Sequence, residues 1–376
     1  MDEYDHQAKV KLGREALALM TNQQNLPYEG HAYDKIMAHT YLALNWMSKG
    51  QAEKARPELI RAYQCQQDAV DRNKRRLAQA RAAAQESSNA NVIQQMMSSQ
   101  RLADTVSSVT RSFEGVKGYA DYVNPFTVYL DGIYFFHNRA DSSDLERSRK
   151  SLTRAFEMSG DNKFILADID MVNAIYRGEQ IAPCTYVIFE TGRSATFEQV
   201  RVDVPIAFNK IAYVGAAFPR LATHDNHIPS LNVSTSTTNT TTSLVANMDS
   251  IIARDFKNEW PIILTKTLVS MVAKAAASYS ANDAAQGTGE FAESFIRFIT
   301  MITQLAINIA DTRSWTTLPK EIQVARIPTP PDRRLTVTGV TGAPVQLALV
   351  EGAVNVVYVK SNSDGSPLLV NQFKLK

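Results

Sequence analysis

The stretch Ile181-Ala182-Pro183-Cys184-Thr185-Tyr186-Val187-Ile188-Phe189-Glu190 marks the point where the pattern of the chain changes. Before it, from Ala8 to Tyr176, apolar residues recur at the spacing of one helix face, which predicts helices. After it, β-branched and aromatic residues bounded by glycine or proline predict three strands, at 185–190, 198–206 and 211–218. The chain is therefore predicted to be α+β.

The helical half, residues 1–180, contains an internal repeat. The segment Arg56-Pro57-Glu58-Leu59-Ile60-Arg61-Ala62-Tyr63 reappears as Arg149-Lys150-Ser151-Leu152-Thr153-Arg154-Ala155-Phe156, and a Tyr-Leu pair precedes each copy, at Tyr41 and Tyr129. Paired helices with a small residue and an aromatic on the second helix resemble tetratricopeptide repeats, although the Trp-Leu-Gly signature of the first helix is missing. A plain helical bundle is the alternative.

Stacked hairpins of this kind leave a concave surface that commonly takes peptide or protein segments. The aromatic residues of the two repeat units are therefore the candidates for partner binding: Tyr41, Tyr63, Tyr129 and Phe156.

Between the two units, residues 66–112 are rich in Ala, Gln, Ser, Lys and Arg, with a break near Ser87. We expect a long helical hairpin that projects from the body. Its cluster Arg72, Lys74, Arg75 and Arg76 is a possible basic patch. Acidic residues lie among these basic residues, and no aromatic residues lie between them to stack on bases. A solvated helix face is therefore favoured over a nucleic-acid site.

The second half is predicted to form two units. Residues 181–320 should combine a mixed β-sheet with two long helices, Asp249–Ser280 and Glu290–Ala310. Residues 321–376 should form a small antiparallel β unit packed on it. The Ser/Thr-rich segment 234–243 is either a linker or a strand-and-turn excursion.

Composition excludes several classes of protein. The 376 residues carry a net charge of +2, so no global field draws the chain to nucleic acid or to an anionic bilayer. The two cysteines, Cys65 and Cys184, provide neither a disulfide framework nor a CxxC pair, and whether they pair with each other stays open. The longest uncharged apolar run, Phe298–Ala310, has 13 residues, short of the roughly 20 that span a bilayer.

Four segments carry a resemblance to a family of uncharacterised bacterial cell-envelope lipoproteins with tetratricopeptide-like N-terminal halves. They are Val187–Gly192 with Val204–Ile206, Ile211–Val214 with Ala217–Pro219, Ile251–Lys274, and Ala310–Pro319 leading into Ile322–Arg326. With the N-terminal repeat they cover most of the chain. The resemblance implies a lipid-anchored periplasmic protein, anchored at the outer membrane and often encoded beside relatives of the curli-secretion lipoprotein.

The N-terminus departs from that family. The first residues are polar and acidic, and neither a signal peptide nor a lipobox cysteine follows Met1. We therefore expect either a trimmed mature form of a periplasmic lipoprotein or a cytoplasmic protein.

Catalytic and metal motifs are missing from the sequence. It contains no Gly-rich phosphate loop, nucleophile elbow, zinc-protease helix or dinucleotide fingerprint. In the segment His224-Asp225-Asn226-His227, two imidazoles and a carboxylate could contribute to a metal site, but a polar loop is favoured because no fourth ligand is evident. Asp168 and Asp170 fall on different faces of a helix and are expected at the surface. We predict no catalytic, cofactor or metal site.

Three charged residues lie beside apolar runs, where an unpaired charge is costly: Glu190, Asp311 and Arg313. We hypothesise that Arg313 and Trp315 lock the end of the helix 290–310 onto the β layer, with Glu190 or Asp311 accepting hydrogen bonds from the guanidinium. A catalytic role for the trio is disfavoured because no nucleophile accompanies it.

An architecture without a reactive constellation predicts a non-enzymatic scaffold or adaptor that binds other cell-envelope proteins through its helical repeats, without a cofactor. Two alternatives stay open. One is an envelope hydrolase whose acidic pair assembles only in three dimensions. The other is a carrier of a small apolar ligand between the two long helices and the sheet.

Overall fold

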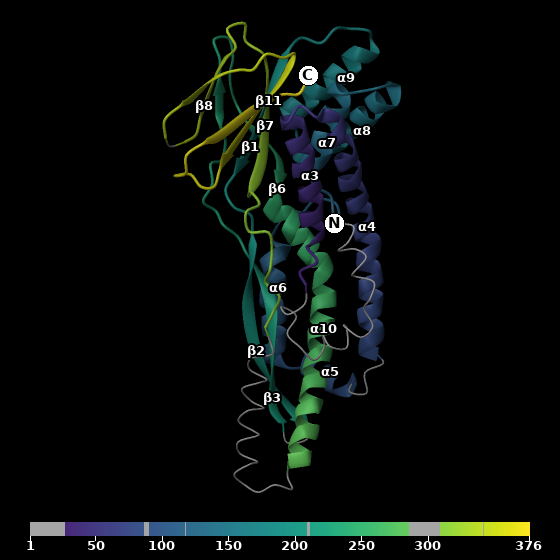
Figure 1. The fold of residues 1–376 in the computed structure, drawn as a ribbon. Helices are drawn as coiled ribbons and strands as arrows, with labels where there is room; N and C mark the ends of the chain where they lie inside the picture. The colour runs from purple at the N-terminus through teal and green to yellow at the C-terminus, as the bar shows by residue number, and fades with distance from the viewer. Residues whose placement is uncertain (1–26, 86–89, 117, 209–210, 286–308, 341) are drawn as a thin grey trace.

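The computed structural model describes residues 27–85, 90–116, 118–208, 211–285, 309–340 and 342–376 (Figure 1). The fold is mixed α+β, with most described helices before residue 181 and most described strands after it, so the predicted α+β class is confirmed. The expected helix 290–310 lies almost wholly outside the described residues.

The described helices before residue 181 include two helical hairpins and a following helix. They are α3 (Ala32–Ser48) with α4 (Ala52–Gln85), α7 (Pro125–His137) with α8 (Ser142–Ser159), and α9 (Lys163–Tyr176). Local chemistry sets their ends: the Asn124 side chain caps α7 and is followed by Pro125, and Asp141 caps α8. Gly50, with φ of 70°, makes the left-handed turn between α3 and α4.

The α7–α8 pair packs closely at Gly132. A Cβ atom at this position would lie 2.7 Å from Cγ of Leu152, so only glycine permits the observed distance between the helices. The hydroxyl of Ser148 strengthens the approach by donating a 2.8 Å hydrogen bond to the Gly132 carbonyl.

Residues 66–112 do not project alone, which corrects the expectation from sequence. The C-terminal part of α4 runs with α10 (Met248–Ala285), while α6 (Gln100–Glu114) contacts α10 and the two-stranded sheet of β2 (Thr196–Phe208) and β3 (Ile211–Ala222). We give the name stalk to the C-terminal part of α4 together with α5 (Ala90–Met97), α6, α10, β2 and β3. These elements extend away from the larger sheet (Figure 1).

The apolar stripe of α6 explains this packing. Leu102, Val109 and Phe113 are buried, and Val106 packs against the core between them. Their intervals of three and four residues place them on one helix face, which therefore needs a covering partner.

The larger sheet has the order β11-β10-β1-β7-β6. Its strands are β1 (Cys184–Thr191), β6 (Ser243–Asn247), β7 (Glu321–Pro328), β10 (Val354–Ser361) and β11 (Leu369–Lys374). The central strand β1 is buried along its whole length; it pairs parallel to β10 and antiparallel to β7, with Val187 opposite Val357 and Ala325. A strand buried on both faces needs a continuous apolar run, as residues 186–189 provide.

Residues 321–376 therefore do not form a unit of their own. Three of their strands share the larger sheet with β1, and the other two join a second sheet with the order β5-β4-β8-β9. Its strands are β4 (Asn232–Ser234), β5 (Asn239–Thr241), β8 (Arg334–Thr338) and β9 (Val345–Ala348). The Ser/Thr-rich segment thus takes the strand-and-turn alternative.

One hydrophobic core runs from the helical hairpins through the larger sheet to α10. Helix α7 is buried along its whole length and contacts β6, while α3 contacts β11 and α9 contacts β7. The core therefore continues across the predicted boundary at residue 181. None of the helices in the described part of the chain is long and apolar enough to cross a membrane.

Candidate functional site

The first junction between helices and sheet joins Tyr41 to Glu190. The Tyr41 hydroxyl on α3 donates a 2.6 Å hydrogen bond to Oε1 of Glu190 on β1. Glu190 is only 1% exposed, and Nζ of Lys360 on β10 lies 3.5 Å from its Oε2. The Trp315 ring lies 5.8 Å from the Tyr41 ring. Tyr41 therefore contacts its own chain rather than lining a free concave surface.

Arg313 takes Asp311, not Glu190, as its acidic partner. Its Nε and Nη2 donate to the two carboxylate oxygens of Asp311 at 2.8 and 2.7 Å. The guanidinium also lies over the Tyr28 ring, 5.4 Å from the ring centre. The segment around Arg313 is thus attached to residues just before α3, while the helix that it was expected to lock lies outside the described residues.

The second junction is centred on Asp168, which is 1% exposed instead of lying at the surface. Its carboxylate accepts hydrogen bonds from Tyr129 on α7 at 2.9 Å and from Tyr186 on β1 at 3.1 Å. Nε of Arg326 on β7 lies 3.2 Å away. Burial raises the pKa of Asp168 to about 6, although Arg326 and the two tyrosines oppose the shift. Tyr129 has no exposed surface, so it cannot contact a partner in this fold.

This second junction also holds a histidine and a thiol. Nε2 of His137 lies 3.0 Å from the Tyr186 hydroxyl, and burial lowers the pKa of His137 to about 3. Burial likewise raises the pKa of Cys184 to about 11, so its thiol stays protonated at neutral pH. Because His137, Asp168, Cys184 and Tyr186 are all buried, this network suits the joining of helices to sheet better than turnover of a substrate.

The two hairpins therefore turn α3 and α7 toward the sheet, and the chain itself covers the face on which a concave binding surface was expected. The remaining two candidates lie on α4 and α8: Tyr63 is 43% exposed, and Phe156 is half-buried against the core. Other large apolar side chains are also exposed on the helical half, and sequence reasoning missed them: Leu42, Leu166 and Tyr176. Their spacing alone does not distinguish them from core residues.

A polar group that we call the waist cluster joins the start of α3 to α4, α10 and the segment around Arg313. Its members are Tyr28, His31, Tyr33, Asp34, Arg76, Asp255, Glu259 and Arg313. Glu259 of α10 is its centre: Oε2 lies 3.4 Å from Nδ1 of His31, and Oε1 accepts a 3.0 Å hydrogen bond from Arg76 of α4. Burial opposes the ionisation of Glu259, but the hydrogen bond and charge of His31, helped by Arg76, lower its pKa to about 2.

The predicted metal candidate is not assembled as a ligand set. His224 hydrogen-bonds Thr196 at 3.1 Å, while Nε2 of His227 lies 3.8 Å from Glu321. Asp225 instead lies 3.2 Å from the amine of Lys320. Within the part of the chain that the structure describes, no group of three or more His, Cys, Asp and Glu side chains could hold a metal ion.

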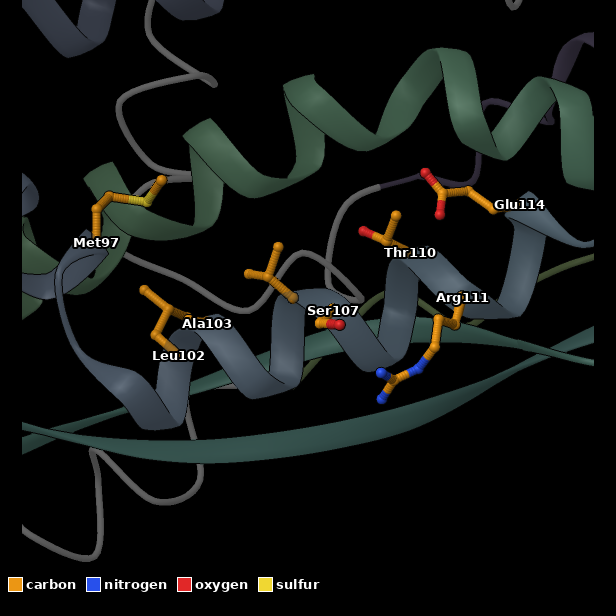
Figure 2. A pocket seen from close by; sticks show the side chains of 8 residues that line it. Met97, Leu102, Ala103, Ser107, Thr110, Arg111 and Glu114 are labelled. Carbon is orange, nitrogen blue, oxygen red and sulfur yellow. The ribbon is translucent and has the colours of Figure 1, made fainter.

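A groove lies along α6 in the stalk, where α6 runs between α10 and the β2–β3 strands (Figure 2). Its volume is about 310 Å³, and it is lined by Met97, Leu102, Ala103, Val106, Ser107, Thr110, Arg111 and Glu114. The lining is apolar near α5 and polar near the C-terminal end of α6. The sequence prediction missed this groove because it treated residues 66–112 as a solvated hairpin.

No protein-family model matches the chain, and no significant match occurs among curated proteins or solved structures.

Proposed function

We propose that the protein is a non-enzymatic scaffold or adaptor of the bacterial cell envelope, held there by a lipid anchor at the outer membrane. It would bind other envelope proteins through the outward sides of tetratricopeptide-like hairpins. The envelope setting rests on the family resemblance of the sequence, and the mode of binding rests on the exposed side chains of the helical half.

One observation carries the proposal. The chain covers α3 and α7 with its own sheet, yet Tyr63 on α4 and Tyr176 on α9 remain 43% and 51% exposed. Tyrosine is enriched among the few residues that dominate protein–protein binding energy. The outward faces of α4 and α9 are therefore favoured over the covered side.

The chemistry of the buried junctions favours binding over catalysis. Asp168 is 1% exposed and contacts Tyr129, Tyr186 and Arg326, and the thiol of Cys184 is protonated at neutral pH. A hydrolase acting on an envelope polymer, the first alternative, needs an acidic pair open to its substrate. The groups around Asp168 instead hold the helical half on the sheet.

Site-specific photo-crosslinking tests the proposal. A benzophenone side chain replaces Tyr63 or Tyr176, and exposed Asn371 on β11 serves as the control position. We expect both aromatic positions to crosslink the same envelope protein in cells, with Asn371 giving none of that product. Equal products at all three positions would contradict the proposal, as would irradiation that yields only the uncrosslinked chain.

The groove along α6 favours a second candidate function, a carrier of a small apolar ligand. Its apolar side can take an aliphatic or aromatic group, and its polar end can orient a head group. The probe is N-phenyl-1-naphthylamine, whose fluorescence rises in apolar surroundings. Ala103→Trp should fill the groove and abolish the rise, while Ala103→Ser should preserve it. An equal signal in both variants would exclude the groove as a carrier site.

A further inference from the structure

We propose that His31 is a protonation-dependent clamp at the waist cluster, joining α3, α10 and the segment around Arg313, and that loss of its proton releases this segment from α10. The inference concerns regulation of the fold and does not depend on the proposed partner or compartment.

The geometry around the His31 ring carries the proposal. Nδ1 faces Oε2 of Glu259 at 3.4 Å, and Nε2 faces the backbone carbonyl oxygen of Arg313 at 3.2 Å. Both neighbouring atoms are acceptors, and a neutral imidazole has only one N–H to donate. Only the imidazolium satisfies both contacts at once.

The ring is fixed in place by its neighbours. It stacks on Tyr33 with 5.0 Å between ring centres and an interplanar angle of 8°, and Phe197 of β2 lies 5.6 Å away. Its own backbone N–H donates a 2.9 Å hydrogen bond to Asp34, at the start of α3. The ring therefore has little freedom to turn away when one of its two bonds is lost.

The charges around the ring favour the protonated state. Titratable and charged groups come from every segment packed around the ring. They are Tyr28 and Asp34 at the start of α3, Asp255 and Glu259 on α10, Arg76 on α4, Tyr122 in the segment before α7, and Asp311 and Arg313 in the segment 309–315. Burial raises the pKa of Asp255 well above its usual range, which disfavours the charged form of this carboxyl group. The hydrogen bond and charge of Glu259 act most strongly on the ring in favour of its protonated state.

The direction of the pH effect follows from these contacts. Burial opposes protonation of His31, but the hydrogen bond and charge of Glu259 outweigh it and raise the pKa to about 9. A histidine whose pKa rises on folding stabilises the folded state fully below its unfolded pKa, near 6.5. That contribution is lost as the pH rises through about 9.

The test combines NMR and hydrogen exchange on the full chain. With ¹⁵N-histidine labelling, both ring nitrogens of His31 should show imidazolium shifts at pH 8. Amide protection of residues 309–315, corrected for intrinsic exchange, should fall between pH 8 and pH 10. A neutral ring at pH 7, or protection unchanged over this range, would overturn the clamp.

Two variants separate the clamp from a general loss of structure. Glu259→Gln keeps the shape of the side chain and should move the His31 titration at least one pH unit lower, together with the loss of protection at 309–315. His31→Gln should lower that protection at every pH and remove its pH dependence, while His224→Gln should behave as wild type. A titration midpoint that Glu259→Gln leaves unchanged would also refute the proposal.

Discussion

The hydroxyl oxygen of Tyr41 lies 2.6 Å from Oε1 of Glu190, so α3 is hydrogen-bonded to the central strand of the larger sheet. Glu190 has little contact with water, and its other close charged group is Lys360 on the neighbouring strand. A buried carboxylate that loses a donor keeps its full cost of desolvation. This one hydroxyl should therefore contribute measurably to the attachment of the hairpins to the sheet.

Tyr41→Phe tests that contribution. Removing the hydroxyl should lower the free energy of unfolding by about 1–3 kcal/mol, because one acceptor of Glu190 is left unpaired. Urea denaturation measures the change. Tyr63→Phe removes a hydroxyl from a side chain that is 43% exposed and whose oxygen accepts a hydrogen bond from Gln67, and should stay within about 0.5 kcal/mol of wild type. Equal decreases in the free energy of unfolding of the two variants would show that the hydrogen bond to Glu190 does not stabilise the fold.

Asp168 should give stability a specific pH dependence. Its pKa is raised on folding from 3.8 to about 6, so the folded state binds the proton more tightly than the unfolded state. The contribution of Asp168 to the free energy of unfolding is therefore highest below about pH 4. It falls as the pH rises to about 6 and is constant above that pH, and the total decrease is about 2–4 kcal/mol.

Asp168→Asn isolates this effect. Urea denaturation at intervals from pH 4 to pH 8 gives the difference between wild type and variant, in which the titration of other groups cancels. The free energy of unfolding of wild type, relative to that of the variant, should be higher at pH 4 than at pH 6. A difference independent of pH would mean that Asp168 has an ordinary pKa in the folded protein.

The α7–α8 contact should be intolerant of a single methyl group. Gly132→Ala places a Cβ atom 2.7 Å from the Leu152 side chain and 3.2 Å from its backbone nitrogen, so the helices must separate. We expect a loss of about 1–3 kcal/mol. Gly115→Ala is the matched control, because its Cβ would meet nothing within 4 Å. Thermal denaturation that ranks Gly115→Ala as the more damaging change would contradict this account.

Local pattern predicted much of the fold. The change of period at residue 181 predicted the α+β class, and the three expected strands fall within β1, β2 and β3. These predictions succeeded because side-chain spacing reports directly on which face of an element is buried. The Ser/Thr-rich segment stayed ambiguous, since threonine suits both strands and linkers.

Pairing between distant segments could not be predicted in the same way. Nothing in residues 354–361 indicates that they pair parallel to β1, so 321–376 resembled a separate unit. Likewise, Asp168 occupies a polar-looking position on α9 and becomes buried only because α9 packs on β7 beside Arg326. The expectation of an open concave surface failed for the same reason. The repeat pattern predicts hairpins, but it does not predict which part of the chain packs on them.

The stalk provides a last prediction, centred on Phe113 of α6. Its ring meets Phe256 of α10 edge-to-face, with 5.3 Å between centres and an angle of 87°, and Trp260 lies 6.5 Å away. Trp260 in turn packs on Phe218 of β3 at 5.6 Å. The aromatic group therefore joins α6, α10 and β3.

Phe113→Ala should cost about 3–5 kcal/mol, because the cavity forms where α6, α10 and β3 meet and rigid helices close it only in part. Met97→Ala, at a position 48% exposed, should cost far less and serves as the control. Hydrogen exchange localises the damage: residues 100–114 should lose protection while β1, held by two strand neighbours, keeps it. Loss of protection in β1 to the same degree would mean that stalk and sheet unfold as one cooperative unit, and the stalk would then have no separate stability for a partner or a ligand to modulate.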